Sequence, residues 1–360
     1  MKKSVESYLE KGRAYRAAGN YEEARRTFAK AIKTDPSNAQ AYYERGKTRD
    51  GGDDYYDDAL DDLYKALELN PNLTDVYLEI VCNDALLGLY PDEEGNEMMT
   101  KYVEGRPNDP MAYIERAWGY FMTCHYEKAI EDYTKAIKLF SEDCDNDIFF
   151  MRGCSYAKMK NFDLALHDFN KAICIKPDEP EYYFERGVLY ENFQNINLAI
   201  ADYKIALQAF NDKKAAGHKV KRHSCLTSRS IATDIYFALG SCYFMQKKYR
   251  EAINKFDLIE ETEHIGQTLF ALKAYSYKNL GEHQKAIQNF NQAIMRRDGL
   301  FSYYFLNRGE SYWALGDIGK RDRDHKAAEF LLHLEETAPE KIKKLTYDCS
   351  TETIIFDDAA

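Results

Sequence analysis

The chain has 360 residues, of which 45% are hydrophobic and 30% charged, and its formal net charge is −11. The apolar content is ample for burial, and only 8 Pro and 19 Gly argue against a disordered or linker-rich chain. The negative charge disfavours a nucleic-acid backbone or an anionic membrane as the main partner.

The sequence also indicates a compartment. The N-terminal stretch has no apolar run of signal-peptide length, and no stretch reaches the roughly 18 apolar residues of a membrane span. We therefore expect no membrane partner. The eight cysteines contain no C-x-x-C pair, which fits a reduced, cytoplasmic setting.

The first stretch, Val5–Asn38, sets a pattern that recurs along the chain. Two aromatic residues flank a small one on one face of a first predicted helix, two alanines flank an aromatic on a second, and a proline follows. In this copy they are Tyr8, Gly12, Tyr15, Ala24, Phe28, Ala31 and Pro36. The small residues let the two helices approach closely, and the aromatics fill the space beside that contact. A helical hairpin this small cannot bury its apolar face alone, so copies must stack.

Nine copies of this unit follow one another. The third is degenerate, since its second helix has lost its alanines, but we still expect a helical pair there. The ninth has Arg321 and His325 on its second helix, as suits a terminal repeat whose outer face meets water. The nine copies are Val5–Asn38, Ala39–Leu73, Thr74–Asp109, Pro110–Asp143, Asn146–Glu179, Pro180–Lys213, Thr233–Gly266, Gln267–Leu300 and Ser302–Glu335.

The unit resembles the tetratricopeptide repeat, which has this pattern of aromatic, Gly and Ala positions ending in Pro. The resemblance covers residues 5–335 and implies an all-α fold, a right-handed α-solenoid superhelix of about nine hairpins. It divides the chain into repeats one to six (5–213), a basic insert (214–232), repeats seven to nine (233–335) and an end segment (336–360). For that end we expect a short capping helix at about 339–345 and an acidic tail, of which 353–356 could dock elsewhere.

A second regularity concerns charge. Arg stands at the seventh position of five repeats, and an Asp follows 16 residues later, or 17 in the second repeat, which has one extra residue. Where the Arg is absent, the Asp is absent too. The pairs are Arg45–Asp62, Arg116–Asp132, Arg152–Asp168, Arg186–Asp202 and Arg308–Asp324. We expect each pair to tie the two helices of its hairpin together, which fixes geometry more surely than it adds stability; a ligand-binding role for the arginines is the alternative.

The candidate binding surface follows from the resemblance. In this family the first helices line a concave face, with positions two, five, nine, twelve and thirteen pointing inward. Here these positions are apolar and aromatic, which suits an amphipathic helix or an extended peptide with bulky anchors. The alternative is core packing, chiefly at position five. The predicted partner-binding residues are Tyr43, Trp118, Phe121, Met122, Phe150, Phe184, Phe244, Met245, Tyr275 and Trp313.

A known subclass of the family holds the acidic C-terminus of chaperones with a clamp of Lys, Asn and Arg. The required residues are absent: the first repeat offers Leu9 and Arg13, and the second offers Glu44. We do not expect a chaperone-tail co-chaperone.

The insert is the strongly basic region of this acidic chain. Its predicted site residues are Lys214, Lys219, Lys221, Arg222 and Arg229. It could contact an acidic partner or RNA, or be a solvated loop. His218, His223 and Cys225 match no established zinc pattern, so no metal site is expected there.

The chain contains no nucleophile elbow, phosphate-binding loop or H-E-x-x-H motif. We therefore predict that it is not an enzyme, needs no cofactor and acts as a scaffold or adaptor that binds a peptide or helix of another protein. One alternative is a regulatory or substrate-recruiting subunit of an enzyme complex; another is RNA binding through the insert.

Overall fold

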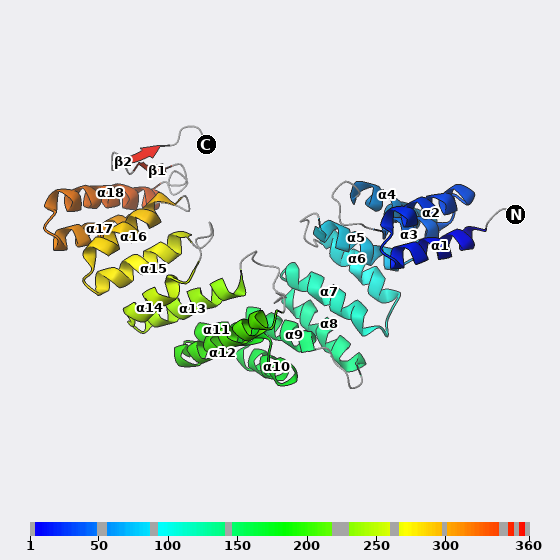
Figure 1. Ribbon diagram of the computed structural model, residues 1–360, viewed down its shortest axis with the longest axis horizontal. Helices are drawn as coiled ribbons and strands as arrows, with labels where there is room; N and C mark the ends of the chain where they lie inside the picture. Colours follow the sequence, from blue (N-terminus) through cyan, green and yellow to red (C-terminus); the bar gives the residue numbers. More distant parts are fainter. Residues whose placement is uncertain are drawn as a thin grey trace. The chain divides into compact units, whose positions relative to one another are not determined.

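The computed structural model describes residues 4–48, 56–86, 93–140, 146–217, 230–259, 266–296, 301–337, 345–348 and 353–356. Within these ranges the chain forms eighteen α-helices and two short β-strands. They belong to two compact units, residues 1–175 and 176–360 (Figure 1).

The first unit contains repeats one to five, and each forms the predicted pair of helices. The degenerate third repeat is a helical pair as well. Consecutive hairpins pack against each other in chain order. The helices are α1 (Val5–Ala17), α2 (Tyr21–Thr34), α3 (Ala39–Gly46), α4 (Tyr56–Leu69), α5 (Asp75–Leu86), α6 (Glu93–Glu104), α7 (Pro110–Met122), α8 (Tyr126–Leu139), α9 (Asn146–Lys158) and α10 (Phe162–Ile175).

The second unit contains repeats six to nine, again as stacked hairpins. Its helices are α11 (Pro180–Asn192), α12 (Ile196–Ala215), α13 (Ile231–Met245), α14 (Tyr249–Phe256), α15 (Gly266–Asn279), α16 (His283–Met295), α17 (Ser302–Ala314) and α18 (Ile318–Thr337). We call the first helix of each repeat its A helix and the second its B helix, and we number repeat positions from the first residue of each copy. The chain is thus an all-α array of hairpins, as the sequence predicts.

The close contact within each hairpin is where the sequence places it. A Cβ atom added to Gly153 would lie 2.9 Å from the ring of Phe169, and one added to Gly240 only 2.3 Å from the ring of Phe256. Both glycines therefore face an aromatic ring of the B helix at a distance that leaves little room for a side chain. The rings themselves are buried, with Phe169 and Phe256 each 1% exposed.

The turn between the A and B helices has the same backbone form in the seven repeats where the structure describes it. Position fifteen has a positive φ: in Gly19, Cys124, Lys160, Gln194, Lys247, Gly281 and Gly316. The next residue donates its N–H to the carbonyl of position eleven, as Asn161 does to Tyr156 at 2.9 Å, and position fifteen bonds to position twelve, as Lys160 does to Ala157. These two bonds define a Schellman cap, which satisfies the last carbonyls of the A helix.

The predicted Arg–Asp pairs are all formed. Their shortest N–O distances are 2.6 Å for Arg45–Asp62, 2.7 Å for Arg116–Asp132, Arg152–Asp168 and Arg186–Asp202, and 2.6 Å for Arg308–Asp324. Each ion pair is bidentate. In the pair of Arg152, for example, Nε donates to one carboxylate oxygen of Asp168 and Nη2 to the other. The guanidinium of Arg152 also lies between the rings of Phe149 and Tyr156, at 5.8 and 5.9 Å. The hairpin role of these arginines is thereby confirmed.

The C-terminal segment differs from the prediction. Leu345–Asp348 (β1) pairs antiparallel with Thr353–Phe356 (β2), where we expected the end of a helix and a loose tail. Leu345 is 7% exposed and packs in one apolar cluster with Ile294 and Leu331, and the half-buried Ile354 joins it. The β-branched run Thr353–Ile355 favours a strand over a helix. The remainder of the predicted capping helix, 339–344, lies outside the described residues.

Candidate protein-interaction surface

The A helices of neighbouring repeats lie side by side. In the first unit α1 contacts α3 and α7 contacts α9, and in the second unit α11, α13, α15 and α17 contact one another in sequence. We call the side of a unit that these helices form its A face. The predicted partner-binding residues all belong to A helices, so their exposure on this face decides which of them a partner could reach.

Position five of the repeat is core. Tyr43, Phe150 and Phe184 are only 6%, 2% and 8% exposed. The ring of Phe150 contacts Phe169, and that of Phe184 contacts Tyr203, in both cases the aromatic of the B helix in the same hairpin. This corrects the prediction that these three residues line a groove, because the space beside the small residue at position eight is filled from position five.

The first unit presents an apolar cluster on α7. Trp118, Phe121 and Met122 are each half-buried. Phe121 meets the ring of Tyr126 edge-on, with centroids 5.6 Å apart, so part of its surface closes the turn to α8. Trp118 and Met122 are four residues apart and share one side of the helix. Each keeps part of its surface exposed.

In the second unit, the open apolar side chains of the A helices lie on α13 and α17. Phe244 is half-buried against Tyr249, while Met245 is 49% exposed. Tyr275 is half-buried, since its ring packs edge-on against Phe290 at 5.2 Å. Trp313 on α17 is 62% exposed, the most open large apolar side chain among the described residues.

Sequence reasoning missed two residues of this surface. Tyr303 and Leu306 precede Trp313 on α17 and are 42% and 39% exposed. Leu306 occupies position five, which is buried or half-buried in the earlier repeats. The signal that could have found it is its place in the ninth repeat, whose second helix already departs from the pattern at Arg321 and His325.

The A face of the first three repeats is charged, and its charges are paired between repeats. Glu44 on α3 is 4% exposed, and its carboxylate contacts Arg13 at 2.6 Å and Arg16 at 2.7 Å, both on α1. Burial by itself would raise the pKa of Glu44, but the hydrogen bonds and charges of the two arginines outweigh it and lower the pKa. Further along, Lys47, the residue that follows α3, contacts Glu79 on α5 at 3.0 Å. These contacts tie neighbouring repeats together.

A similar network joins the last two repeats. Asn307 on α17 donates to the hydroxyl of Tyr275 on α15 at 3.3 Å. Lys278, one turn after Tyr275, donates to Asn307 at 2.6 Å and forms an ion pair with Glu310. The polar groups beside Tyr275 are therefore engaged within the unit, and the apolar side chains are the part left open.

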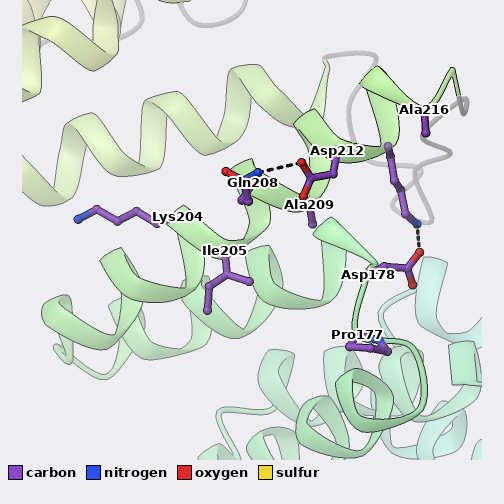
Figure 2. Close-up of a pocket in the computed structure, with 9 residues that line it drawn as sticks. Pro177, Asp178, Lys204, Ile205, Gln208, Ala209, Asp212 and Ala216 are labelled. Carbon is purple, nitrogen blue, oxygen red and sulfur yellow. Dashed lines mark hydrogen bonds and ion pairs between the residues drawn. The ribbon is translucent and has the colours of Figure 1, made fainter.

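A cavity of about 620 Å³ lies elsewhere in the second unit, along α12 (Figure 2). Its polar lining is paired: Gln208 donates to Asp212 at 2.8 Å, and Lys213 contacts Asp178 at 3.5 Å. The aliphatic lining includes Ile205, which is 44% exposed. Because α12 is a B helix, this cavity is not part of the A face.

Of the predicted basic-insert residues, only Lys214 falls within the described residues, as an exposed side chain near the end of α12. Lys219, Lys221, Arg222 and Arg229 lie outside them. Within the described ranges, no group of three His, Cys, Asp or Glu side chains is arranged to hold a metal ion. No helix in those ranges has the length and apolarity needed to cross a membrane.

Comparison with known families agrees with the repeat pattern. Sequence models described as TPR repeat and tetratricopeptide repeat match residues 12–49, 110–143, 150–214 and 268–298. These matches fall in both units, and each spans helices of the hairpins described above. The chain is a tetratricopeptide repeat (TPR) protein. Proteins of this kind are interaction scaffolds, and the TPR fold is typically non-catalytic.

The chain is also similar to solved structures. A chain of the APC/C hetero-tetramer Cut9–Hcn1 aligns with a TM-score of 0.50 and 17% identity over 86% of this chain and 52% of that one. The TPR chain thus spans about half the length of that relative. A tetratricopeptide repeat protein from Parabacteroides merdae ATCC 43184 aligns with a TM-score of 0.46, 16% identity, and coverage of 80% and 91%. MamA aligns with a TM-score of 0.35, 23% identity, and coverage of 57% and 96%. A search of curated proteins found no match.

Proposed function

We propose that this TPR protein is a cytoplasmic scaffold or adaptor that binds a peptide or amphipathic helix of a partner protein on its A faces. The observation that carries the proposal is the open apolar surface on two A helices. Trp313 and Tyr303 are 62% and 42% exposed on α17, and Trp118 and Met122 are half-buried on α7. Large aromatic side chains on a surface are the residues that most often dominate a protein–protein contact.

Two further features support the proposal. Aromatic and Met side chains dominate the open part of the A face, and the polar groups beside Tyr275 are already paired. The five cysteines within the described residues form no disulfide, as is usual in a reducing compartment: Cys82, Cys124, Cys154, Cys174 and Cys242.

The test uses alanine substitutions on the two A faces. Trp118→Ala and Trp313→Ala should each weaken capture of the partner from an extract of the source cells, identified by mass spectrometry, and should leave helicity and melting temperature nearly unchanged. Matched controls are Leu164→Ala and Leu332→Ala, which remove exposed apolar side chains, 43% and 48% exposed, from the B helices α10 and α18.

A large fall in melting temperature would mean that the tryptophans are core residues. Equal capture by all four variants would contradict the A-face proposal. If the captured protein is an enzyme, the scaffold acts as a regulatory or recruiting subunit.

A further inference from the structure

On the A face of the first unit, charged residues follow a register: they recur at fixed positions of the repeat. Position nine of one repeat provides a cation, and position six of the next provides a carboxylate. Arg13 meets Glu44 at 2.6 Å between repeats one and two, and Lys47 meets Glu79 at 3.0 Å between repeats two and three. Both pairs link an A helix to the next A helix, so the chain neutralises each carboxylate with a residue of the preceding repeat.

Between repeats three and four, the carboxylate of this register is present but the cation is missing. Position six of repeat four is again a carboxylate, Glu115, but position nine of repeat three is Cys82, which carries no positive charge. Glu115 is half-buried on α7 and forms no hydrogen bond or ion pair within the described residues. Burial raises the pKa of its carboxyl group. A partly desolvated carboxylate without a cation is unfavourable, and a cation placed beside it would recover that cost.

The next residues along α7 are apolar. Trp118 lies three residues after Glu115 and Met122 seven after it, so the three side chains share one side of the helix. The following repeat has Met151 at position six, opposite Trp118 at position nine of repeat four in the same register. The charged part of the A face therefore ends at Glu115, and the apolar part begins one turn later.

We propose that Glu115 selects a basic side chain of the partner: a Lys or Arg of the bound segment takes the place that Arg13 and Lys47 hold in the two preceding repeats. An apolar side chain of the same segment then lies on Trp118 and Met122. The inference rests on the proposed function and names the chemistry of its partner, a segment with a basic residue next to a bulky apolar one. The ring of Trp118 adds to the preference, because a cation beside an indole face is attracted to it.

The experiment uses the full chain and a random peptide library displayed on phage. Selection on the wild-type chain should enrich peptides with Lys or Arg next to an aromatic or aliphatic residue. Selection on Glu115→Gln, which keeps the shape and removes the charge, should enrich the apolar residue without the basic one. A peptide selected on the wild type should bind Glu115→Gln at least about tenfold more weakly, as expected for a hydrogen bond between charged groups.

A second variant tests the register itself. Cys82→Lys supplies the missing cation from within the chain. It should therefore weaken binding of the same peptide by about tenfold and raise the melting temperature of the protein. The matched control is Glu127→Gln, which removes one exposed negative charge from α8 and leaves the A face unchanged. It should bind the peptide as the wild type does.

The possible results separate the two proposals. If the selected peptides have apolar anchors and no basic preference, and Glu115→Gln binds them as tightly as the wild type, the inference about Glu115 is wrong and the proposed function stands. If the library yields no binder, both fail. If Trp118→Ala binds every selected peptide unchanged, the inference about Glu115 is overturned, and the proposed function rests on the A face of α17 alone. If Glu127→Gln weakens binding of the peptide as much as Glu115→Gln does, the loss of affinity reflects overall charge, and the inference is overturned.

Discussion

Arg308 and Asp324 form an ion pair that is almost completely enclosed, with the two side chains 4% and 7% exposed. Nη2 and Nε of Arg308 donate to the two carboxylate oxygens at 2.6 and 2.9 Å, and Nη1 donates to Asn291 at 2.6 Å. The rings of Phe305 and Tyr312 lie on the guanidinium at 5.2 and 5.9 Å. In the equivalent pair of the second repeat, the side chain of Arg45 is 33% exposed.

This difference in exposure predicts a difference in free energy of unfolding. Asp324→Ala leaves a buried guanidinium without its carboxylate and should cost about 3–5 kcal/mol. Asp62→Ala should cost clearly less, since water can reach Arg45. The double variant Arg308→Met with Asp324→Leu should recover most of the loss, because an apolar pair of similar size removes the uncompensated charge. Urea unfolding of the full chain measures all three, and equal losses for Asp324→Ala and Asp62→Ala would contradict the prediction.

The Schellman turns give a stabilising prediction. Lys160 and Lys247 have φ of 59° and 60° at a position where other repeats have Gly. A left-handed conformation costs a residue with a Cβ about 1–2 kcal/mol, and Gly avoids that cost. Lys160→Gly and Lys247→Gly should therefore each raise the free energy of unfolding by up to about 1 kcal/mol.

The reverse substitution serves as the control. Gly281, with φ of 74° and nothing near its missing Cβ, is limited by backbone conformation alone. Gly281→Ala should lower the melting temperature. Ala157→Gly, three residues before Lys160 in α9, should also lower it, because Ala157 is helical and Gly disfavours a helix. A fall in melting temperature for Lys160→Gly would contradict the prediction that the left-handed backbone of Lys160 lowers the stability of the protein.

Two carboxylates on the A face should respond to pH in opposite ways. The pKa of Glu44 is lowered in the folded chain. The stabilisation that its carboxylate gives the folded state is therefore present above the unfolded pKa near 4.5 and is lost as the pH falls through the lower folded pKa. The pKa of Glu115 is raised by burial, so folding is penalised as pH rises above about 4.5 and the carboxyl ionises.

Substitution by Gln tests both signs. At pH 7, Glu44→Gln should melt below the wild type and Glu115→Gln above it. As the pH is lowered through 4, both differences should shrink, because all the carboxyls become protonated. Melting curves at a series of pH values measure the effect. A Glu115→Gln variant that melts below the wild type at pH 7 would mean that its charge is already compensated in the free chain.

The hairpins and their ion pairs could be predicted from the sequence because both are local. Arg152 and Asp168 are 16 residues apart on two helices joined by a short turn, so helical spacing alone brings them together. The Schellman turns were harder to predict, since Cys124, Lys160, Gln194 and Lys247 do not mark a left-handed position as Gly does.

By itself, the sequence determined that this protein is a stack of helical hairpins, because the spacing of small and aromatic residues within one repeat fixes how its two helices meet. Only the tertiary structure decided which side chains of the A helices stay open: Phe150 is buried and Trp313 is not, since exposure depends on neighbouring helices. The contact of Arg13 with Glu44, the isolation of Glu115 and the β1–β2 hairpin were likewise decided there. They depend on the register between separate elements, which no spacing within a single repeat encodes.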